Sequence, residues 1–160
     1  MKTLCIIRHA KTEVQQQGQL DFDRQLAPRG LKDAPEIAHL MKEKNMQPDR
    51  IVSSPAARAI STARIFGEVL HYPENKMEQN SLIYNASVAT LLKVVQGFDD
   101  EHKTVFMVGH NPGITLLSNI LCLPPILHIP TSGVVCIDFD VKHWNAIKAM
   151  SGSQKFFVSP

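Results

Sequence analysis

The sequence predicts a single-domain, three-layer α/β/α fold with a mostly parallel central sheet and an antiparallel C-terminal edge. Short apolar runs without polar alternation recur along the chain, as in parallel strands that are buried on both faces. Each of the first three runs is followed by a segment with helical periodicity. A length of 160 residues, with 44% hydrophobic and 20% charged residues, suits one domain over residues 1–160.

The first unit consists of a strand, a long loop and a helix. Four apolar residues, Leu4 to Ile7, predict a buried central strand. The polar stretch over residues 13–26 has no periodicity and is interpreted as a loop above the strand ends. Apolar residues at helical spacing predict a helix from Pro28 to Glu43, with a kink or restart near Pro35 because proline lacks a backbone donor.

The middle of the chain repeats this alternation. The expected elements are a strand over residues 50–53 with a helix after it, a short extended segment over 82–84, a helix over 87–97, a strand over 104–108 and a helix over 114–121. Ser54 and Pro55 suit the N-cap and first position of the helix after the second strand. This placement puts Arg58 in the first turns of that helix.

The last third of the chain is expected to form the antiparallel edge of the sheet. Its prolines exclude regular structure over residues 123–130. Residues 135–139 are expected to pair with residues 144–150 across a turn at 140–143. The tail from residue 151 is expected to pack back as one more extended piece.

Composition argues against several classes of protein. No apolar run approaches the ~20 residues of a membrane span, and the stretch after Met1 is too short for a signal peptide, so we expect a cytoplasmic protein without a membrane partner. A formal charge of +2 without a run of Lys or Arg, and only 6% aromatic residues, argue against a nucleic-acid partner. Cys5, Cys122 and Cys136 lie far apart among apolar residues, so we expect reduced core cysteines and neither a disulfide framework nor a cysteine metal site.

Cationic or potentially cationic side chains follow three of the predicted strands. Arg8 and His9 come directly after the first strand. Arg58 follows the second strand, and His110 follows the third. Ligands of open α/β sheets bind at the carboxyl ends of the strands, and a helix N-terminus there adds backbone donors and a positive dipole. We therefore expect these side chains to surround one anion.

Phosphoryl transfer is the chemistry that best fits two arginines and two histidines at such an edge. The transferred group carries negative charge that must be neutralised while a nucleophile attacks in line. Arginine stays protonated and its planar donors match phosphate oxygens. A neutral imidazole keeps a free lone pair near pH 7 and can form a phosphoramidate. We expect His9 to be the nucleophile and His110 to donate to a phosphate oxygen.

Three motifs resemble those of the histidine phosphatase superfamily, also called phosphoglycerate-mutase-like. They are Arg8-His9-Ala10-Lys11-Thr12, Ser53-Ser54-Pro55-x-x-Arg58-Ala59-x-x-Thr62-Ala63 and Val108-Gly109-His110-Asn111-Pro112. The short chain, Ala10, and the pattern Asp23-Arg24-x-Leu26-x-x-x-Gly30 are most similar to the SixA-type phosphohistidine phosphatases.

This resemblance implies an α/β fold, a phosphorylated His9, and no metal or organic cofactor. It also implies a set of phosphate ligands: Arg8, Arg58, His110 and, as a further contact, Arg24. Asn111 is included as a phosphate-binding candidate, with orientation of His110 or capping of the following helix as its alternatives.

One departure from the family pattern bears on the substrate. Many members carry a carboxylic acid shortly before the third helix, whereas residues 81–87 here contain none. Imidazole leaves more easily than an alcohol, so this absence favours a phosphoramidate such as phosphohistidine, or another activated phosphate, over ordinary sugar-phosphate esters. Glu13, Asp21 or Asp23 could still supply a proton from the loop. The short connections also suggest an open site that admits a phosphorylated protein.

Three other functions stay open at this stage. A general phosphomonoesterase or mutase would act on a small phosphorylated substrate, and a non-catalytic module would only bind phosphate. A metal protein using His9 and His110 is disfavoured because Arg8 and Arg58 would repel the cation. The sequence does not determine the oligomeric state.

Overall fold

A mixed sheet of six strands, in the order β3-β2-β4-β1-β5-β6, forms the centre of the computed structural model, which describes residues 1–160. The strands are β1 (Lys2–Arg8), β2 (Arg50–Ser53), β3 (Glu78–Gln79), β4 (Thr104–Gly109), β5 (Val134–Phe139) and β6 (Gly152–Val158). β3, β2, β4 and β1 pair in parallel, and β5 and β6 add an antiparallel edge. The predicted fold class is confirmed.

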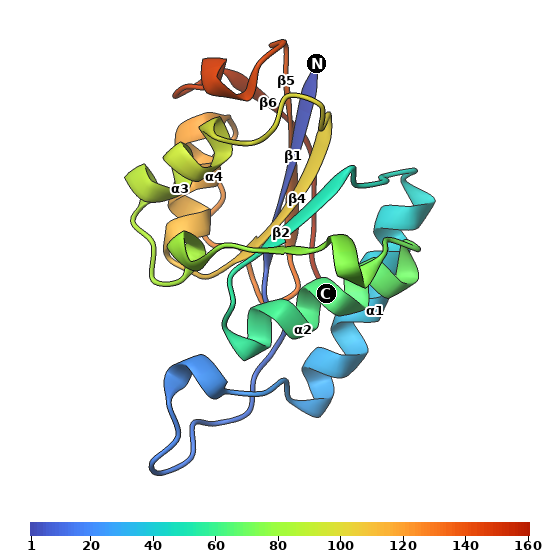
Figure 1. Ribbon diagram of the computed structural model, residues 1–160, viewed down its shortest axis with the longest axis vertical. Helices are drawn as coiled ribbons and strands as arrows, with labels where there is room; N and C mark the ends of the chain where they lie inside the picture. The colour runs from blue at the N-terminus through green and yellow to red at the C-terminus, as the bar shows by residue number, and fades with distance from the viewer.

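Two layers of helices cover the sheet (Figure 1). The helices are α1 (Pro28–Glu43), α2 (Ala57–Val69), α3 (Val88–Gln96) and α4 (Gly113–Leu121). α1 and α2 bury their apolar side chains on one face, and α3 and α4 on the other. Side chains of β1 alternate between the two cores, with Leu4 and Ile6 on the α3–α4 face and Ile7 on the α1–α2 face. This explains why the strand is apolar at every position.

Two predicted features of the helices differ from the structure. α1 is continuous through Pro35, without a restart. The carbonyl that this proline leaves without its helical donor belongs to Leu31, which is 56% exposed and so can bind water. α2 begins at Ala57 with Ala56 as its N-cap, so the prediction that Ser54 caps this helix is wrong.

The structure also corrects the extended segments. β5 pairs with β6 rather than with residues 144–150, because Trp144 is fully buried in a short 3-10 helix (Trp144–Ala146) and its indole N–H donates to the His102 carbonyl oxygen at 2.8 Å. Residues 82–84 belong mainly to another 3-10 helix, Ser81–Ile83. The two-residue strand β3 lies within what is predicted to be a polar connection.

A disulfide joins Cys5 to Cys136, so the expectation that all three cysteines are reduced is wrong. The reason is the antiparallel register of β1 and β5, which places these residues directly opposite each other with their Cα atoms 4.1 Å apart. Cys122 is a free, buried cysteine, as predicted. No helix combines the length and apolar character needed to cross a bilayer.

Candidate active site

The two central parallel strands bring His9 and His110 together. Because β1 and β4 pair in register from Thr3–Thr104 to Arg8–Gly109, the residues that follow them emerge at the same edge of the sheet. The His9 backbone N–H donates to the Gly109 carbonyl oxygen at 3.2 Å. The two imidazole rings lie with their centroids 5.2 Å apart. Two residues separated by 101 positions in the chain thus form one cluster.

His9 is a neutral imidazole with a defined tautomer. Its Nδ1 lies 2.9 Å from the carbonyl oxygen of Ala10, and since a carbonyl can only accept, Nδ1 carries the proton and Nε2 keeps a free lone pair. Burial lowers the pKa of His9 to about 4, and the charges of Arg58 and Arg8 act in the same direction. The ring is therefore uncharged at neutral pH, as a nucleophile requires.

Arg58 lies in the first turn of α2, and its side chain is only 7% exposed. It donates from Nη1 to the Asp21 carbonyl oxygen at 2.7 Å and from Nη2 to Asp21 Oδ2 at 2.9 Å. These bonds use the terminal edge of the guanidinium. The adjacent edge, formed by Nε and the second N–H of Nη2, makes no hydrogen bond within the protein and can bind an anion.

His110 is connected to the turn between β2 and α2. Its Nε2 lies 2.7 Å from Ser54 Oγ, which also accepts the Ala56 backbone N–H at 3.2 Å. Ser54 therefore organises the site rather than capping the helix. Burial, and to a smaller extent the charges of His9 and Arg58, lowers the pKa of His110 to about 3. Its Nδ1 is buried and has no partner in the protein.

Arg8 and Asn111 share one backbone acceptor. The Ile129 carbonyl oxygen accepts from Arg8 Nη1 at 3.1 Å and from Asn111 Nδ2 at 2.8 Å. Asn111 Oδ1 also accepts from the hydroxyl of Thr115 at 2.7 Å, which ties it to α4. Both ends of its amide thus have protein partners, and its contact with phosphate stays a prediction. Arg8 Nε is buried without a partner.

Arg24 fixes the loop over residues 13–26 beside the site. Its Nη2 donates to Thr12 Oγ1 at 2.7 Å, and its Nη1 to Asp21 Oδ1 at 3.3 Å. Its positive charge is one of those that lower the pKa of His9. The charges of Arg8, Arg24 and Arg58 therefore all act on the His9 ring.

The sequence assigned no role to two residues at the site, Tyr84 and Thr62, although Thr62 stands in one of the family motifs, and it left the role of Asp21 open. The Tyr84 hydroxyl donates to Asp21 Oδ2 at 2.8 Å, so the segment before α3 contributes a phenol where the family pattern has a carboxylic acid. The Thr62 hydroxyl accepts the Ala10 N–H at 2.9 Å and donates to the Arg58 carbonyl oxygen at 2.8 Å. Tyr84 and its two arginine neighbours hold the pKa of Asp21 at about 2 despite its partial desolvation. Asp21 is thus ionised and is no acid at neutral pH.

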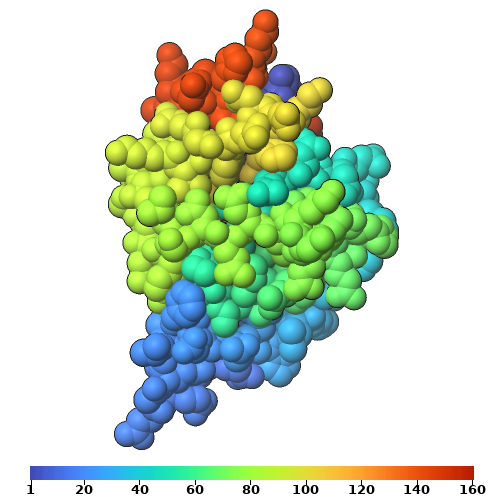
Figure 2. Space-filling model, viewed as in Figure 1, coloured from blue at the N-terminus to red at the C-terminus, as the bar shows by residue number.

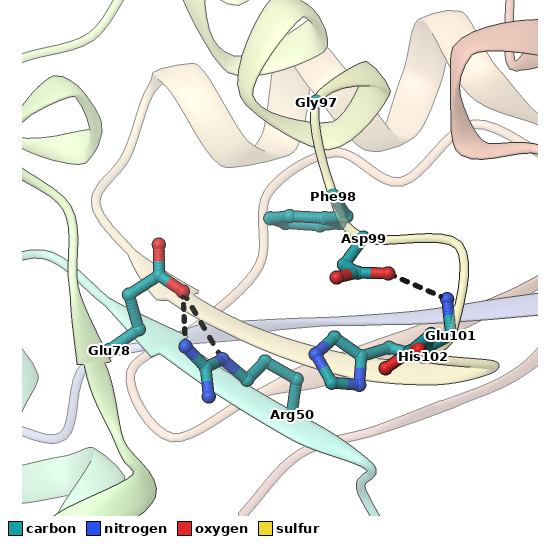
Figure 3. Close-up of a pocket in the computed structure, with 7 residues that line it drawn as sticks. All are labelled: Arg50, Glu78, Gly97, Phe98, Asp99, Glu101 and His102. Atoms are coloured by element: carbon teal, nitrogen blue, oxygen red, sulfur yellow. Dashed lines mark hydrogen bonds and ion pairs between the residues drawn. The ribbon is translucent and has the colours of Figure 1, made fainter.

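A hollow of about 370 Å³ opens beside His110, lined also by residues 85–87 and 111–113. Another, of about 420 Å³, lies at the amino ends of β2 and β4 (Figure 3). His9, by contrast, follows the carboxyl end of the parallel strand β1. In the second hollow, Arg50 pairs with Glu78 at 2.8 Å. We assign no role to this second hollow, because its cation is already neutralised. No three His, Cys, Asp or Glu side chains are grouped as metal ligands.

Comparison with known proteins agrees with this geometry. The model of the histidine phosphatase superfamily, branch 1, matches residues 4–80. An uncharacterized protein of Mycobacterium tuberculosis is 30% identical over 115 residues, which cover 72% of this chain and 69% of the relative. The SixA protein of Agrobacterium tumefaciens superposes with a TM-score of 0.83 and 26% identity, covering 99% of this chain and 98% of the other. A protein histidine phosphatase SixA complexed with tungstate superposes with a TM-score of 0.84 and 22% identity, covering 99% of this chain and 97% of the other.

A three-layer α/β/α fold with two imidazoles and several arginines at the carboxyl ends of parallel strands defines a phosphate-handling class of protein. Within that class, the chain belongs to the histidine phosphatase superfamily. Phosphatase activity is the function that this membership supports.

Proposed function

We propose that this protein removes phosphate from protein phosphohistidine through a phosphorylated His9. The observation that carries the proposal is the tautomer of His9. Its Nδ1–H is donated to the Ala10 carbonyl oxygen, which leaves a lone pair on Nε2, and the positive charges of Arg58, Arg8 and Arg24 act on the ring. A neutral nucleophile beside fixed cations is what attack on a phosphoryl group requires.

The reaction consists of two displacements at phosphorus. His9 Nε2 attacks the phosphorus, and the bond from phosphorus to the leaving group breaks with its electron pair. Water then attacks phospho-His9, releases phosphate and restores the lone pair. The free edge of Arg58, together with Arg8 and Arg24, neutralises the phosphoryl oxygens. His110 donates to one of them from Nε2, which then exchanges Ser54 Oγ for the phosphoryl oxygen.

The lack of a proton donor for the leaving group favours phosphohistidine over an ester as the substrate. An alkoxide needs a proton as it leaves, but Asp21 is ionised and residues 81–87 contain no carboxylic acid. Imidazole leaves in neutral form once its second nitrogen is protonated. The similarity to a protein histidine phosphatase that binds tungstate, a phosphate-like oxyanion, supports the same substrate class.

Kinetics of His9→Gln test the proposal, with His39→Gln on the exposed face of α1 as the matched control. We expect His9→Gln to lose about 1,000-fold or more in kcat on a phosphohistidine peptide, and wild type to show acid-labile label that the variant lacks. His39→Gln should behave as wild type. Preference of the wild type for small esters would indicate a general phosphomonoesterase or mutase. Phosphate binding without label or turnover would indicate a non-catalytic module.

A further inference from the structure

We propose that Asp21 receives the leaving group: its carboxylate accepts the N–H of the departing imidazole and so selects phosphohistidine over phosphate esters. This inference rests on the function proposed above and assigns to Asp21 a role other than that of a proton donor. It depends on where Asp21 lies relative to Arg58, on which of its oxygens is free, and on the charges around it.

Asp21 and the expected phosphate site lie on adjacent edges of one guanidinium. Asp21 occupies the terminal edge of Arg58 through its carbonyl oxygen and Oδ2. The edge that includes Nε is left for the phosphoryl oxygens. Arg58 can therefore bind both anions at once, and binding of phosphate does not require Asp21 to move away. Its carboxylate then lies directly beside the bound phosphoryl group.

One oxygen of the Asp21 carboxylate has capacity for a further hydrogen bond. Oδ2 accepts from Arg58 at 2.9 Å and from Tyr84 at 2.8 Å, which uses both of its lone pairs. Oδ1 accepts only the long, 3.3 Å bond from Arg24. The side chain is 40% exposed, so a substrate group can reach it. The loop that contains it projects from one end of the molecule (Figure 2).

The charges that face Asp21 keep it an acceptor. Arg58, Arg24 and the Tyr84 hydroxyl all donate to it, and the neutral His110 ring lies 5.5 Å from the Tyr84 ring. The pKa of the carboxyl is accordingly about 2. Asp21 can thus accept a hydrogen bond throughout the neutral range, but it has no proton to give.

This arrangement fits the chemistry of a phosphorylated imidazole. The substrate ring carries phosphorus on one nitrogen and a proton on the other. When His9 Nε2 bonds to phosphorus, the old P–N electron pair returns to the substrate nitrogen, and the ring leaves as neutral imidazole with its proton still in place. Asp21 stabilises the protonated ring before departure and adds no proton. An ester with an anionic leaving group would instead be repelled by the carboxylate.

Aromatic rings border the same position. The Tyr84 ring packs edge-on against the Phe22 ring, with the two ring centroids 5.3 Å apart. The Arg58 guanidinium lies 6.0 Å from the Tyr84 ring centroid. These contacts restrict Tyr84, which in turn fixes Oδ2 of Asp21. Tyr84 is therefore a positioning residue for the carboxylate.

The experiment compares Asp21→Asn with Asp23→Asn on two substrates, a phosphohistidine peptide and p-nitrophenyl phosphate. The two substitutions remove the same charge from the same loop. The Asp23 side chain is exposed and makes no hydrogen bond or ion pair with the protein, so nothing holds it in place as a proton donor. We expect Asp21→Asn to lose about 10- to 100-fold in kcat/KM on the peptide, the effect of a hydrogen bond to a charged group. On the ester we expect no loss, and at most about a threefold gain, because the repulsion of the anionic leaving group is removed. Asp23→Asn should match wild type on both.

A pH profile separates leaving-group recognition from a purely structural role. In wild type the carboxylate favours the protonated substrate ring, so kcat/KM on the peptide should persist to higher pH than in Asp21→Asn. Tyr84→Phe, like Asp21→Asn, should lose activity at a lower pH than wild type, but with a smaller displacement of the profile. Equal losses on both substrates with an unchanged profile would overturn the role of Asp21 and leave the proposed function intact. A wild type that hydrolyses only the ester would overturn both.

Discussion

Thr62→Val tests whether one buried hydroxyl connects the nucleophile to the arginine helix. Thr62 is fully buried, accepts the Ala10 N–H and donates to the Arg58 carbonyl oxygen. Valine has nearly the same shape but no acceptor, so it leaves the Ala10 N–H buried without a partner. That costs about 1–3 kcal/mol, and we expect the free energy of unfolding to fall by about 2 kcal/mol.

Urea unfolding measures this loss as a lower midpoint with an unchanged slope. Activity should fall by about tenfold as well, because the carbonyl of Ala10 orients the His9 ring and a small displacement of a nucleophile is costly. Thr62→Ser is the control: it loses a methyl group, worth about 1 kcal/mol, but keeps the hydroxyl and should keep the activity. The reasoning is refuted if the valine variant matches the serine variant in kcat, or wild type in midpoint.

Two further predictions concern the loss of stability at low pH and the close backbone packing at Gly30. The pKa of His9 is about 4 when folded and near 6.5 when unfolded, so the unfolded chain binds more protons between these values. Stability should therefore fall as pH drops below 6.5, and His9 alone accounts for roughly 3 kcal/mol of this fall once pH is below about 4, with His110 adding to it. Urea unfolding at several pH values should show a smaller fall for His9→Gln. A Cβ at Gly30 would overlap the carbonyl oxygen of Lys11, so Gly30→Ala should cost about 1–3 kcal/mol in unfolding free energy, whereas at Gly97 the nearest atom is 3.4 Å away and Gly97→Ala should lower thermal stability far less.

Hydrophobic patterning was sufficient to predict the sheet centre, because strands buried on both faces and amphipathic helices leave strong local signals. The bounds of α1 and β2 match the predicted ones. Elements that depend on distant partners were predicted less well. The choice of β6 over residues 144–150 as partner of β5 depends on the burial of Trp144, and the disulfide depends on the β1–β5 register. Neither is visible in a local window.

The candidate site likewise contains residues that could be predicted from the sequence and residues that could not. Arg8, His9, Arg58 and His110 could be predicted to converge because parallel strands and helix N-termini bring their ends to one edge. The contact of Tyr84 with Asp21 could not, since it joins residues 63 positions apart through a loop without periodicity. The absence of a carboxylate before the third helix was the only local sign that another group takes that place.

The backbone oxygen of Ile129 has an implication for how this fold can change. Since Arg8 and Asn111 are both fixed by a main-chain atom, exchanging Ile129 for another apolar residue of similar size leaves their anchor in place. Insertion or deletion of residues between α4 and β5 would displace that oxygen and release both side chains together. The segment between α4 and β5 should therefore tolerate changes of side chain better than changes of length. New loops grafted onto this fold would have to keep that length.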